Sequence, residues 1–557
     1  MNAWQFIRSS LRHYRRTQLA VAMGVAVATA VLTGALLVGD SVRGSLRDLT
    51  LQRLGRIDSA IVAGHPFRTE LAKEVARNAE FQKFFTAVQP AILLNGSLQA
   101  GHEGAVRRAT AISVVGCEPE FWSLGKGGPA KALRGDEVAI SQSIATELGV
   151  ATGDSVLLRI PLAGAIPADS MLGAKQIEKT TRRRRFQVAA VLPPIGLARF
   201  GLTPNQQLPR NVFVSLGALQ DLLKQRGKAN AILVATDIPN AASGDDAEAA
   251  LKHALQPRLE DYGLRVERLR SPAGYQISAD ELVLPDALVR AAERLWNGGG
   301  LQPVVTYLAN TITVGQGAAR RMIPYSIVTG VDSTSPLGPL SDTAGKPIKL
   351  ADDEIALNKW AADDLKANVG ESVTLKYYEP ESTHGKLQER DSPLLKLRAI
   401  VPLETADGKP SLAADPKLTP ELPGVTDQKS IADWDLPFPL VEKIRPQDEA
   451  YWNKYRTTPK AFVSFATAKQ LWPSRWGTIS LLRMPQGKSD AEYIDLLRHA
   501  VDPAAMGMNM LQVKRLGLEA SAGTTPFSVL FLGFSFFLIA SAVMLVAILF
   551  SLGVEQR

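Results

Sequence analysis

Residues 136–158 read DEVAISQSIATELGVATGDSVLL, and residues 353–375 read DEIALNKWAADDLKANVGESVTL. The two stretches align without a gap, and Gly153 meets Gly370 in the alignment. In each of them an alternating apolar run, a segment with helical spacing, a glycine and a second alternating run follow one another. This pattern predicts a strand, a short helix, a tight turn and another strand, present twice in the same chain.

The repetition extends beyond these two stretches. Further segments match in the same order along the chain: ISVVG at 112–116 with SIVTG at 326–330, VFVSLGALQDLL at 212–223 with AFVSFATAKQLW at 461–472, LKHAL at 251–255 with LRHAV at 497–501, and VERL at 266–269 with VKRL at 513–516. Segments that recur in one order at a period of about 220 residues indicate a duplicated structural unit. We therefore predict two homologous core modules, at residues 57–270 and 272–517, in which Phe213 is equivalent to Phe462.

Each module mixes short strands with short helices, which predicts an α+β fold with mixed sheets. The copies differ mainly at about residues 403–458, where the second module carries a proline-rich insert. The insert contains the aromatic residues Trp434, Phe438, Tyr451, Trp452 and Tyr455. Aromatic residues in such a loop either form a recognition surface for a partner or fold the loop onto its own module.

Four consecutive arginines precede a predicted strand of the first module: Arg182, Arg183, Arg184 and Arg185. They could bind phosphate or acidic lipid headgroups, and we include them in the candidate partner surface. The alternative interpretation is a solvated loop.

Two apolar runs flank the modules, at residues 19–39 and at residues 527–554. The first run has 21 residues without a charge and follows an arginine-rich amphipathic segment at residues 1–18. A run of this length spans a bilayer, and the preceding arginines indicate a cytoplasmic N-terminus. We predict two transmembrane helices, a stalk helix at residues 40–56, and modules outside the cytoplasm. The alternative for the first run is a cleaved secretory signal.

Small residues recur at every fourth position of the first run: Ala22, Ala26, Ala30 and Gly34. Small residues at this spacing let a second helix approach closely, although they are common in membrane spans in any case.

Composition and motifs limit the function. The chain of 557 residues has a net charge of +8, which favours anionic lipids or acidic partners beside a membrane. Cys117 is the single cysteine, so an intrachain disulfide and a four-cysteine metal site are excluded. The sequence lacks a phosphate-binding loop, a His-Glu-x-x-His motif and a Gly-x-Ser-x-Gly motif. We therefore predict no enzyme, no metal, no cofactor on this chain and no nucleic-acid partner.

The blocks ISVVGCEPEFW, GDEVAISQSIATELGVATGDSVLLRI, FQVAAVLPP and NVFVSLGALQDLL, between two membrane spans, resemble ABC-transporter permeases of the MacB/FtsX type with a MacB-like periplasmic core domain. The resemblance implies a multi-pass protein of the bacterial inner membrane that transmits ATP-driven motion to its extracytoplasmic part. That motion would serve export, lipoprotein release or regulation of the cell envelope.

The same resemblance implies partners. They are a separate cytoplasmic ABC ATPase that binds ATP, further permease spans or a second permease copy, membrane lipids, and an extracytoplasmic protein or cargo. The sequence departs from the family in two ways: its core domain is duplicated, and it stops at residues 554–557, where the family continues into a coupling segment. We expect a permease half or fragment. The alternative is a membrane-tethered scaffold or binding protein, and an extracytoplasmic hydrolase is disfavoured because catalytic motifs are missing.

Overall fold

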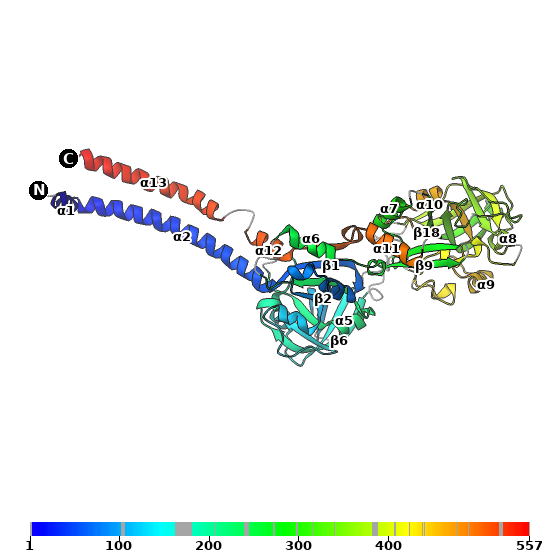
Figure 1. Ribbon diagram of the computed structural model, residues 1–557, viewed down its shortest axis with the longest axis horizontal. Helices are drawn as coiled ribbons and strands as arrows, with labels where there is room; N and C mark the ends of the chain where they lie inside the picture. The colour runs from blue at the N-terminus through cyan, green and yellow to red at the C-terminus, as the bar shows by residue number, and fades with distance from the viewer. Residues whose placement is uncertain are drawn as a thin grey trace.

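Two long helices form a stalk at one extremity of the computed structural model (Figure 1). Helix α2 (Arg15–Leu54) has 40 residues and is about 60 Å long at 1.5 Å per residue. It follows the short helix α1 (Ala3–His13), and α13 (Phe527–Glu555) lies alongside it. Both chain ends therefore lie at the same end of an elongated molecule, and the sheet modules lie at the other end.

The structure describes residues 3–555 except 102–105, 162–180, 205–206, 239–243, 271–272, 297–298, 316, 339, 381–387, 406–407, 423, 437, 439, 476, 488 and 523–526. Within this part of the chain, Gln18–Leu54 is the one helix that is long and apolar enough to cross a membrane by length and composition. Ile539–Leu552, inside α13, is a shorter apolar helix. The second predicted span therefore stays a prediction.

The first repeat contains thirteen main elements: β1 (Ile57–Arg68), α3 (Glu70–Ala76), β2 (Ala87–Ala100), β3 (Arg107–Cys117), β4 (Glu137–Ser141), α4 (Gln142–Leu148), β5 (Ser155–Pro161), β6 (Thr181–Leu192), β7 (Asn211–Ser215), α5 (Leu216–Leu223), β8 (Lys228–Ala235), α6 (Asp245–Ala254) and β9 (Leu264–Arg270).

The second repeat runs through the same order with two additions, β15 and α9. Its elements are β10 (Ala273–Ala279), α7 (Asp286–Leu295), β11 (Gln302–Val314), β12 (Arg321–Val331), β13 (Glu354–Asn358), α8 (Lys359–Asp364), β14 (Ser372–Tyr378), β15 (Glu389–Asp391), β16 (Leu395–Val401), α9 (Pro446–Tyr455), β17 (Ala461–Ser464), α10 (Phe465–Leu471), β18 (Leu481–Pro485), α11 (Asp490–Ala500) and β19 (Met508–Leu511). Helix α12 (Val513–Ala522) follows and leads towards α13.

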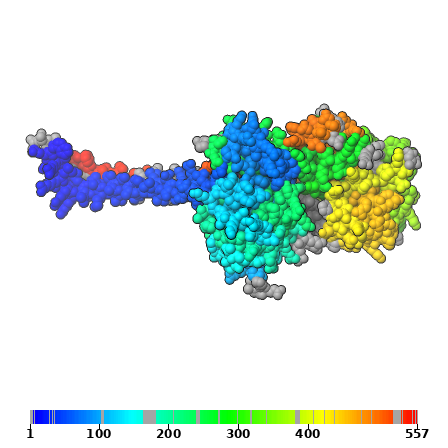
Figure 2. Space-filling view, turned by 60° about the horizontal axis from the view of Figure 1, so that its bottom comes forward, coloured from blue at the N-terminus to red at the C-terminus, as the bar shows by residue number. Residues whose placement is uncertain are grey.

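The two sheets have the same strand order. The first sheet reads β19-β1-β8-β2-β3-β7-β4-β6-β5, and the second reads β9-β10-β18-β11-β12-β17-β13-β16-β14-β15. In each sheet one extra pairing, β2 with β5 or β11 with β14, closes six strands into a ring. The remaining strands form an open α+β half together with helices. The predicted α+β class with two sheet modules is confirmed, and Figure 2 shows the modules as two broad lobes beside the narrow stalk.

Local geometry also repeats between the modules. Gly153 and Gly370 both have a φ of 99°, a conformation that side chains rarely adopt. Their N–H groups donate hydrogen bonds of 2.8 Å to the carbonyl oxygens of Val188 and Leu397, which are equivalent positions of β6 and β16. The glycine aligned in the sequence therefore makes the same turn in both copies.

A second pair of glycines lets a helix approach the sheet. A Cβ on Gly116 of β3 would lie 2.6 Å from the Cδ2 atom of Leu219 in α5. A Cβ on Gly330 of β12 would overlap the Cβ of Ala468 in α10. These helices follow β7 and β17, which contain the matching Phe213 and Phe462, both fully buried.

The last strand of each repeat pairs in the sheet of the other repeat. β9 ends the first repeat and pairs antiparallel with β10, while β19 ends the second repeat and pairs antiparallel with β1. The sheets therefore do not follow the expected division between residues 270 and 272. The match of Val266 with Val513 is also not structural, because Val266 lies in β9 and Val513 begins helix α12.

One hydrophobic core runs through the open halves of both modules. It includes Ile61 and Val234 of the first repeat, Ile277 and Leu482 of the second, and Met508 of the exchanged strand β19. Burial of this shared core stabilises the junction, because separation of the modules would expose it to water.

Gly330→Ala should lower the stability of the second module by about 1–3 kcal/mol, because the added methyl group overlaps Ala468 and α10 must move. The measurement is the urea or thermal unfolding midpoint of the detergent-solubilised chain. Gly64→Ala in β1 is the matched control, since nothing lies within 4 Å of its Cβ position. Equal midpoints for the two variants would contradict the close approach.

Candidate functional site at the base of the stalk

The stalk helix α2 passes directly into the first sheet. Gly55 ends the helix with a φ of 57°, and its N–H donates to the carbonyl oxygen of Leu51 at 2.8 Å. The N–H of the next residue, Arg56, donates to the carbonyl oxygen of Leu124 at 2.8 Å, and β1 begins at Ile57. A Cβ on Gly55 would collide with that carbonyl oxygen. The end of α2 is therefore fixed against the module without a flexible linker.

Helix α12 returns from strand β19 and packs against the same part of α2. Gly517 is buried at this contact, and a Cβ there would lie 2.6 Å from the Cγ2 atom of Thr50. Helix α2 leads into β1, and helix α12 follows β19. Because β19 pairs with β1, the two helices are connected to neighbouring strands of one sheet. The segments of chain that enter and leave the modules are thus held together at one point.

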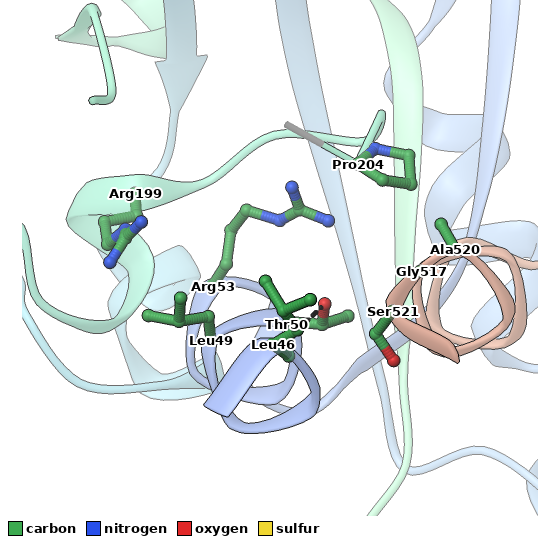
Figure 3. A pocket seen from close by; sticks show the side chains of 9 residues that line it. All are labelled: Leu46, Leu49, Thr50, Arg53, Arg199, Pro204, Gly517, Ala520 and Ser521. Carbon is green, nitrogen blue, oxygen red and sulfur yellow. Dashed lines mark hydrogen bonds between the residues drawn. The ribbon is translucent and has the colours of Figure 1, made fainter. Parts of the chain in front are cut away.

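A cavity of about 240 Å³ lies beside this helix contact (Figure 3). Its lining includes Thr50 and Arg53 of α2, Arg199 of η3 (Gly196–Arg199), and Gly517 and Ser521 of α12. The Arg53 side chain extends into the region between Arg199 and Pro204 in Figure 3. Three separate elements of the chain therefore meet around one basic cavity.

The Arg53 side chain is only partly satisfied. The residue is 7% exposed, and its Nη1 atom donates to the carbonyl oxygen of Thr203 at 3.0 Å. Its Nε and Nη2 atoms are buried without a hydrogen-bond partner. The charge of Arg199 repels that of Arg53, and no ion pair with a carboxylate is found for Arg53 in the described part of the chain.

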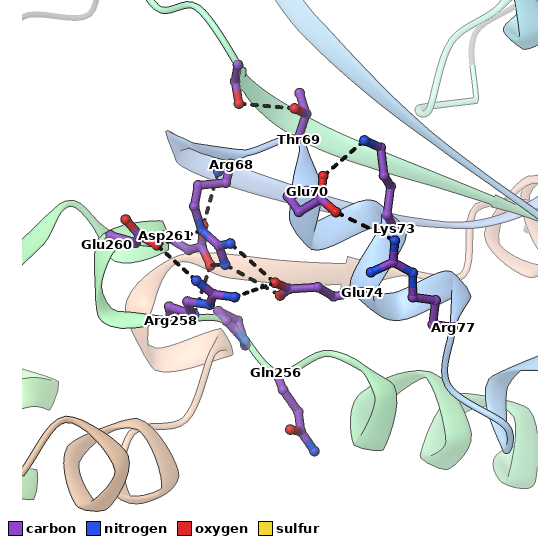
Figure 4. A network of polar contacts seen from close by, with 12 residues as sticks. Arg68, Thr69, Glu70, Lys73, Glu74, Arg77, Gln256, Arg258, Glu260 and Asp261 are labelled. Atoms are coloured by element: carbon purple, nitrogen blue, oxygen red, sulfur yellow. Dashed lines mark hydrogen bonds and ion pairs between the residues drawn. The ribbon is translucent and has the colours of Figure 1, made fainter. Parts of the chain in front are cut away.

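A second polar cluster fixes the connection between the modules (Figure 4). It is centred on Asp261 of η4 (Leu259–Tyr262), which is fully buried on the segment that leads from α6 to the exchanged strand β9. Its carboxylate accepts hydrogen bonds from Arg68 Nε at 2.9 Å and Nη2 at 2.6 Å, and from the backbone N–H groups of Arg68 at 3.0 Å and Arg258 at 2.8 Å. Glu74 pairs with Arg68 and Arg258 at 3.3 and 2.8 Å. The bidentate pair of Arg68 with Asp261 attaches the crossing segment to the end of β1.

The second module holds the same crossing segment from the other side. Arg498 of α11 donates from Nε to the carbonyl oxygen of Pro257 at 3.1 Å and from Nη2 to that of Gln256 at 2.7 Å. Side chains from both modules therefore satisfy backbone groups at the crossing.

The small-residue series of the first span is not buried by the described side chains. Ala22, Ala26 and Ala30 are exposed, and nothing lies within 4 Å of a Cβ built on Gly34. The helices approach at Gly24 instead, where a Cβ would lie 3.6 Å from Leu545 Cδ2. Packing of the series against another membrane helix stays a prediction.

The arginine run lies within a strand, which corrects the expected loop. Arg182, Arg183, Arg184 and Arg185 belong to β6 and pair with residues of β5. Arg183 and Arg185 are exposed, whereas Arg184 forms an ion pair with Asp136 and lies 5.6 Å from the ring centre of Phe186. Their role in binding a partner stays a prediction.

The aromatic residues of the insert do not form the expected partner surface. Trp434, Phe438, Tyr451 and Trp452 are between 2 and 8% exposed, and Tyr455 is half-buried. Trp434 and Trp452 meet edge to face with ring centres 5.0 Å apart in a small core of the insert. These contacts agree with the alternative interpretation, in which the insert folds onto its own module, and a role of the insert in binding a partner stays a prediction.

Sequence reasoning missed Arg53, Arg199 and Asp261. The position of Arg53 near the end of a long helix gave no signal, since charged residues are common in a stalk outside a membrane. Groups of three or more His, Cys, Asp or Glu side chains that could hold a metal ion are not found in the described ranges.

Comparison with known proteins gives a family match over part of the chain. Residues 19–254 match the family model described as MacB-like periplasmic core domain, which confirms the resemblance over this part of the chain. The second sheet repeats the strand order of the first and is consistent with a second domain of the same kind. No curated protein sequence gives a significant match.

Solved structures with detectable similarity share little sequence with this chain. The periplasmic region of MacB from Actinobacillus actinomycetemcomitans is 14% identical, with 37% of this chain and 86% of that chain covered and a TM-score of 0.24. The extracellular domain of the noncanonic ABC-type transporter YknZ from Gram-positive bacteria is 12% identical, with 35% and 92% covered and a TM-score of 0.22. A domain of a putative permease from Porphyromonas gingivalis is 15% identical, with 37% and 86% covered and a TM-score of 0.23.

Asp261→Asn should lower stability by about 3 kcal/mol, because it leaves the Arg68 guanidinium without its buried carboxylate. The measurement is the midpoint of thermal or urea unfolding. Glu260→Gln is the matched control, since the adjacent Glu260 side chain is 56% exposed and also pairs with Arg68. Its loss should change stability by less than about 1 kcal/mol. A larger effect of the Glu260 change would place the main contact elsewhere.

The burial of Lys460 predicts that the free energy of unfolding depends on pH in the alkaline range. Lys460 is 4% exposed, its Nζ atom lies 4.8 Å from the ring centre of Trp360 and 3.8 Å from Asp448 Oδ1, and burial lowers the pKa of Lys460 to about 8. In the unfolded chain the lysine pKa is about 10.4, so between these values the unfolded chain binds more protons and rising pH favours folding.

Between about pH 8 and 10, the stability of the wild type should therefore rise relative to that of Lys460→Met. Urea unfolding midpoints of both proteins at several pH values measure this difference. Lys359→Met, at a lysine whose side chain is 54% exposed, is the control and should leave the wild-type trend in place. A constant difference between wild type and Lys460→Met across this range would show that Lys460 does not carry the effect.

Proposed function

Because residues 19–254 contain a MacB-like periplasmic core domain, we propose that the chain is a permease subunit of a bacterial ABC transporter of the MacB/FtsX type. In this proposal the chain transmits ATP-driven motion from the membrane to its extracytoplasmic modules. The motion serves export, lipoprotein release or regulation of the cell envelope. The ATP is bound by a separate cytoplasmic ATPase, and this chain has no catalytic role.

The observation that carries the proposal is the junction between the stalk and the first sheet. Helix α2 runs without a break from the apolar segment to Leu54 and continues at Ile57 as β1. The neighbouring strand β19 continues into α12, whose Gly517 packs on Thr50 of α2. A relative movement of the two helices would therefore act directly on two paired strands.

The second module can receive the same movement because it is tied to the first by more than one segment. β19 and β9 cross between the modules in opposite directions, and the Asp261 cluster and Arg498 hold one crossing from both sides. The modules share a continuous apolar core at this junction. These contacts support the proposal that a movement of the stalk helices displaces both modules together.

The proposed arrangement in the membrane follows from charge and length. Arg8, Arg12, Arg15 and Arg16 precede the first apolar run, which favours a cytoplasmic N-terminus in the inner membrane. α13 has 29 residues, enough to cross a bilayer, and would serve as the second span. Further permease spans or a second permease copy would complete the membrane part.

A reversible disulfide across the stalk contact tests this function. Thr50→Cys and Gly517→Cys place two thiols where α12 meets α2, while burial raises the pKa of native Cys117 to about 12 and keeps it unreactive. The full-length permease is purified from membranes together with its ATPase, and ATP hydrolysis is measured in oxidised and reduced samples. Oxidation should lower ATP hydrolysis about fivefold or more, and reduction should restore it.

The single variant Gly44→Cys, at a glycine of α2 with nothing within 4 Å of its Cβ position, is the control and should be insensitive to oxidation. An ATPase that never copurifies would favour the membrane-tethered scaffold instead. Full ATP hydrolysis in a crosslinked sample would exclude movement between α2 and α12.

A further inference from the structure

The guanidinium group of Arg53 lacks partners for two of its nitrogen atoms. Nη1 donates to the carbonyl oxygen of Thr203 at 3.0 Å, whereas the buried Nε and Nη2 atoms donate to nothing in the described structure. A buried donor without an acceptor lowers stability because its lost hydration is not replaced, and the loss is larger when the group is charged. A folded protein retains such a group at a cost unless something outside the chain satisfies it.

The cavity around Arg53 carries positive charge, and none of its described lining residues is a carboxylate. Arg199 lines the same cavity and repels Arg53 electrostatically (Figure 3). The hydroxyl groups of Thr50 and Ser521 donate to the carbonyl oxygens of Leu46 and Leu518 within their own helices. After a small rotation of the Arg53 guanidinium group, an anionic oxygen in this cavity would accept its free hydrogen bonds and reduce the repulsion between Arg53 and Arg199.

We propose that this cavity binds a small oxyanion of the phosphate or carboxylate class, with Arg53 and Arg199 as the cationic ligands. A guanidinium group presents parallel N–H donors in a fork that matches the oxygen atoms of carboxylate and phosphate. The free volume of about 240 Å³ is below the range of drug-sized ligand pockets, which is about 300–1,000 Å³, and suits a small anion.

The position of the cavity favours a soluble anion over a lipid headgroup. The apolar run ends at Gly39, fourteen residues before Arg53, which corresponds to about 20 Å along a helix. The headgroup layer extends only about 5–8 Å beyond the hydrocarbon core on each side. A phosphate group of a lipid in a flat bilayer would therefore lie short of Arg53.

The bound anion would lie among three elements that line the cavity. Arg53 belongs to α2, Arg199 belongs to η3 of the first module, and Gly517 of α12 lines the opposite side of the cavity. An anion in this position would stabilise the stalk against the module. This binding does not depend on transport activity and holds equally for a tethered scaffold.

The test is a titration with inorganic phosphate of the full-length chain in phosphatidylcholine nanodiscs, followed by calorimetry. We expect one saturable site per chain, and acetate should compete for it. Arg53→Gln should weaken binding about tenfold or more, because a hydrogen bond to a charged group is lost. Arg199→Gln should also weaken binding while it leaves the Arg53 bond to Thr203 in place.

Arg47→Gln is the matched control, because it removes the same charge from an exposed position of α2 about 1.7 turns away. It should leave the affinity for phosphate unchanged. Arg53→Lys, which keeps the charge but loses the fork, should bind phosphate more weakly than the wild type. If Arg53→Gln proves unfolded by circular dichroism, the Arg199→Gln titration decides.

Absence of saturable binding, or equal weakening by Arg47→Gln, would overturn the proposal. A second arm repeats the phosphate titration in nanodiscs that contain phosphatidylglycerol. The affinity for phosphate should be the same in both lipid compositions. The opposite result would be that phosphatidylglycerol suppresses phosphate binding to the wild type and has no such effect on Arg53→Gln. This result would assign the site to a lipid headgroup and overturn the proposal of a soluble anion.

Discussion

The pairing of β19 with β1 determines how this protein is assembled. β1 follows the stalk helix α2, and β19 precedes the returning helix α12, so the antiparallel register of Ala60 with Leu511 places both helices at one sheet edge. Without this pairing the second repeat would end in its own lobe, and α12 would have no reason to lie beside Thr50. A single ladder of backbone hydrogen bonds thus closes the chain back onto its starting point.

The same exchange explains why two modules of similar fold share one hydrophobic core. Because β9 covers the edge of β10 while β19 covers the edge of β1, separation of the lobes would expose two sheet edges and the core that contains Ile61 and Leu482. Exposed edges present unpaired backbone groups and are costly or prone to aggregation. The duplication therefore does not give two independent domains on a linker, although each sheet closes its own six-stranded ring.

Sequence patterns predicted the features that depend on neighbouring residues. The paired glycines Gly153 and Gly370 identified equivalent turns because only a few consecutive residues decide a backbone conformation of this kind. The exchange of β9 and β19 escaped prediction, since a strand carries no local record of which distant strand it pairs with. The aromatic insert was ambiguous for a related reason: the same Trp434 serves a surface or a core, and packing against Trp452 decides between them.

The partly buried Arg68 and the buried Arg53 have different partners at the two junctions of the first module. Arg68, at the far end of β1, meets the carboxylate of Asp261 through Nε and Nη2, so the charge and the hydrogen bonds are matched within the protein. Arg53, just before the other end of β1, is equally placed to fix a helix but finds one carbonyl oxygen and another arginine. A matched pair makes the stability of a junction independent of an added ligand, whereas an unmatched charge makes that stability depend on what binds there. The junction between the modules is therefore self-sufficient, and the junction with the stalk is the one whose stability an external ion can change.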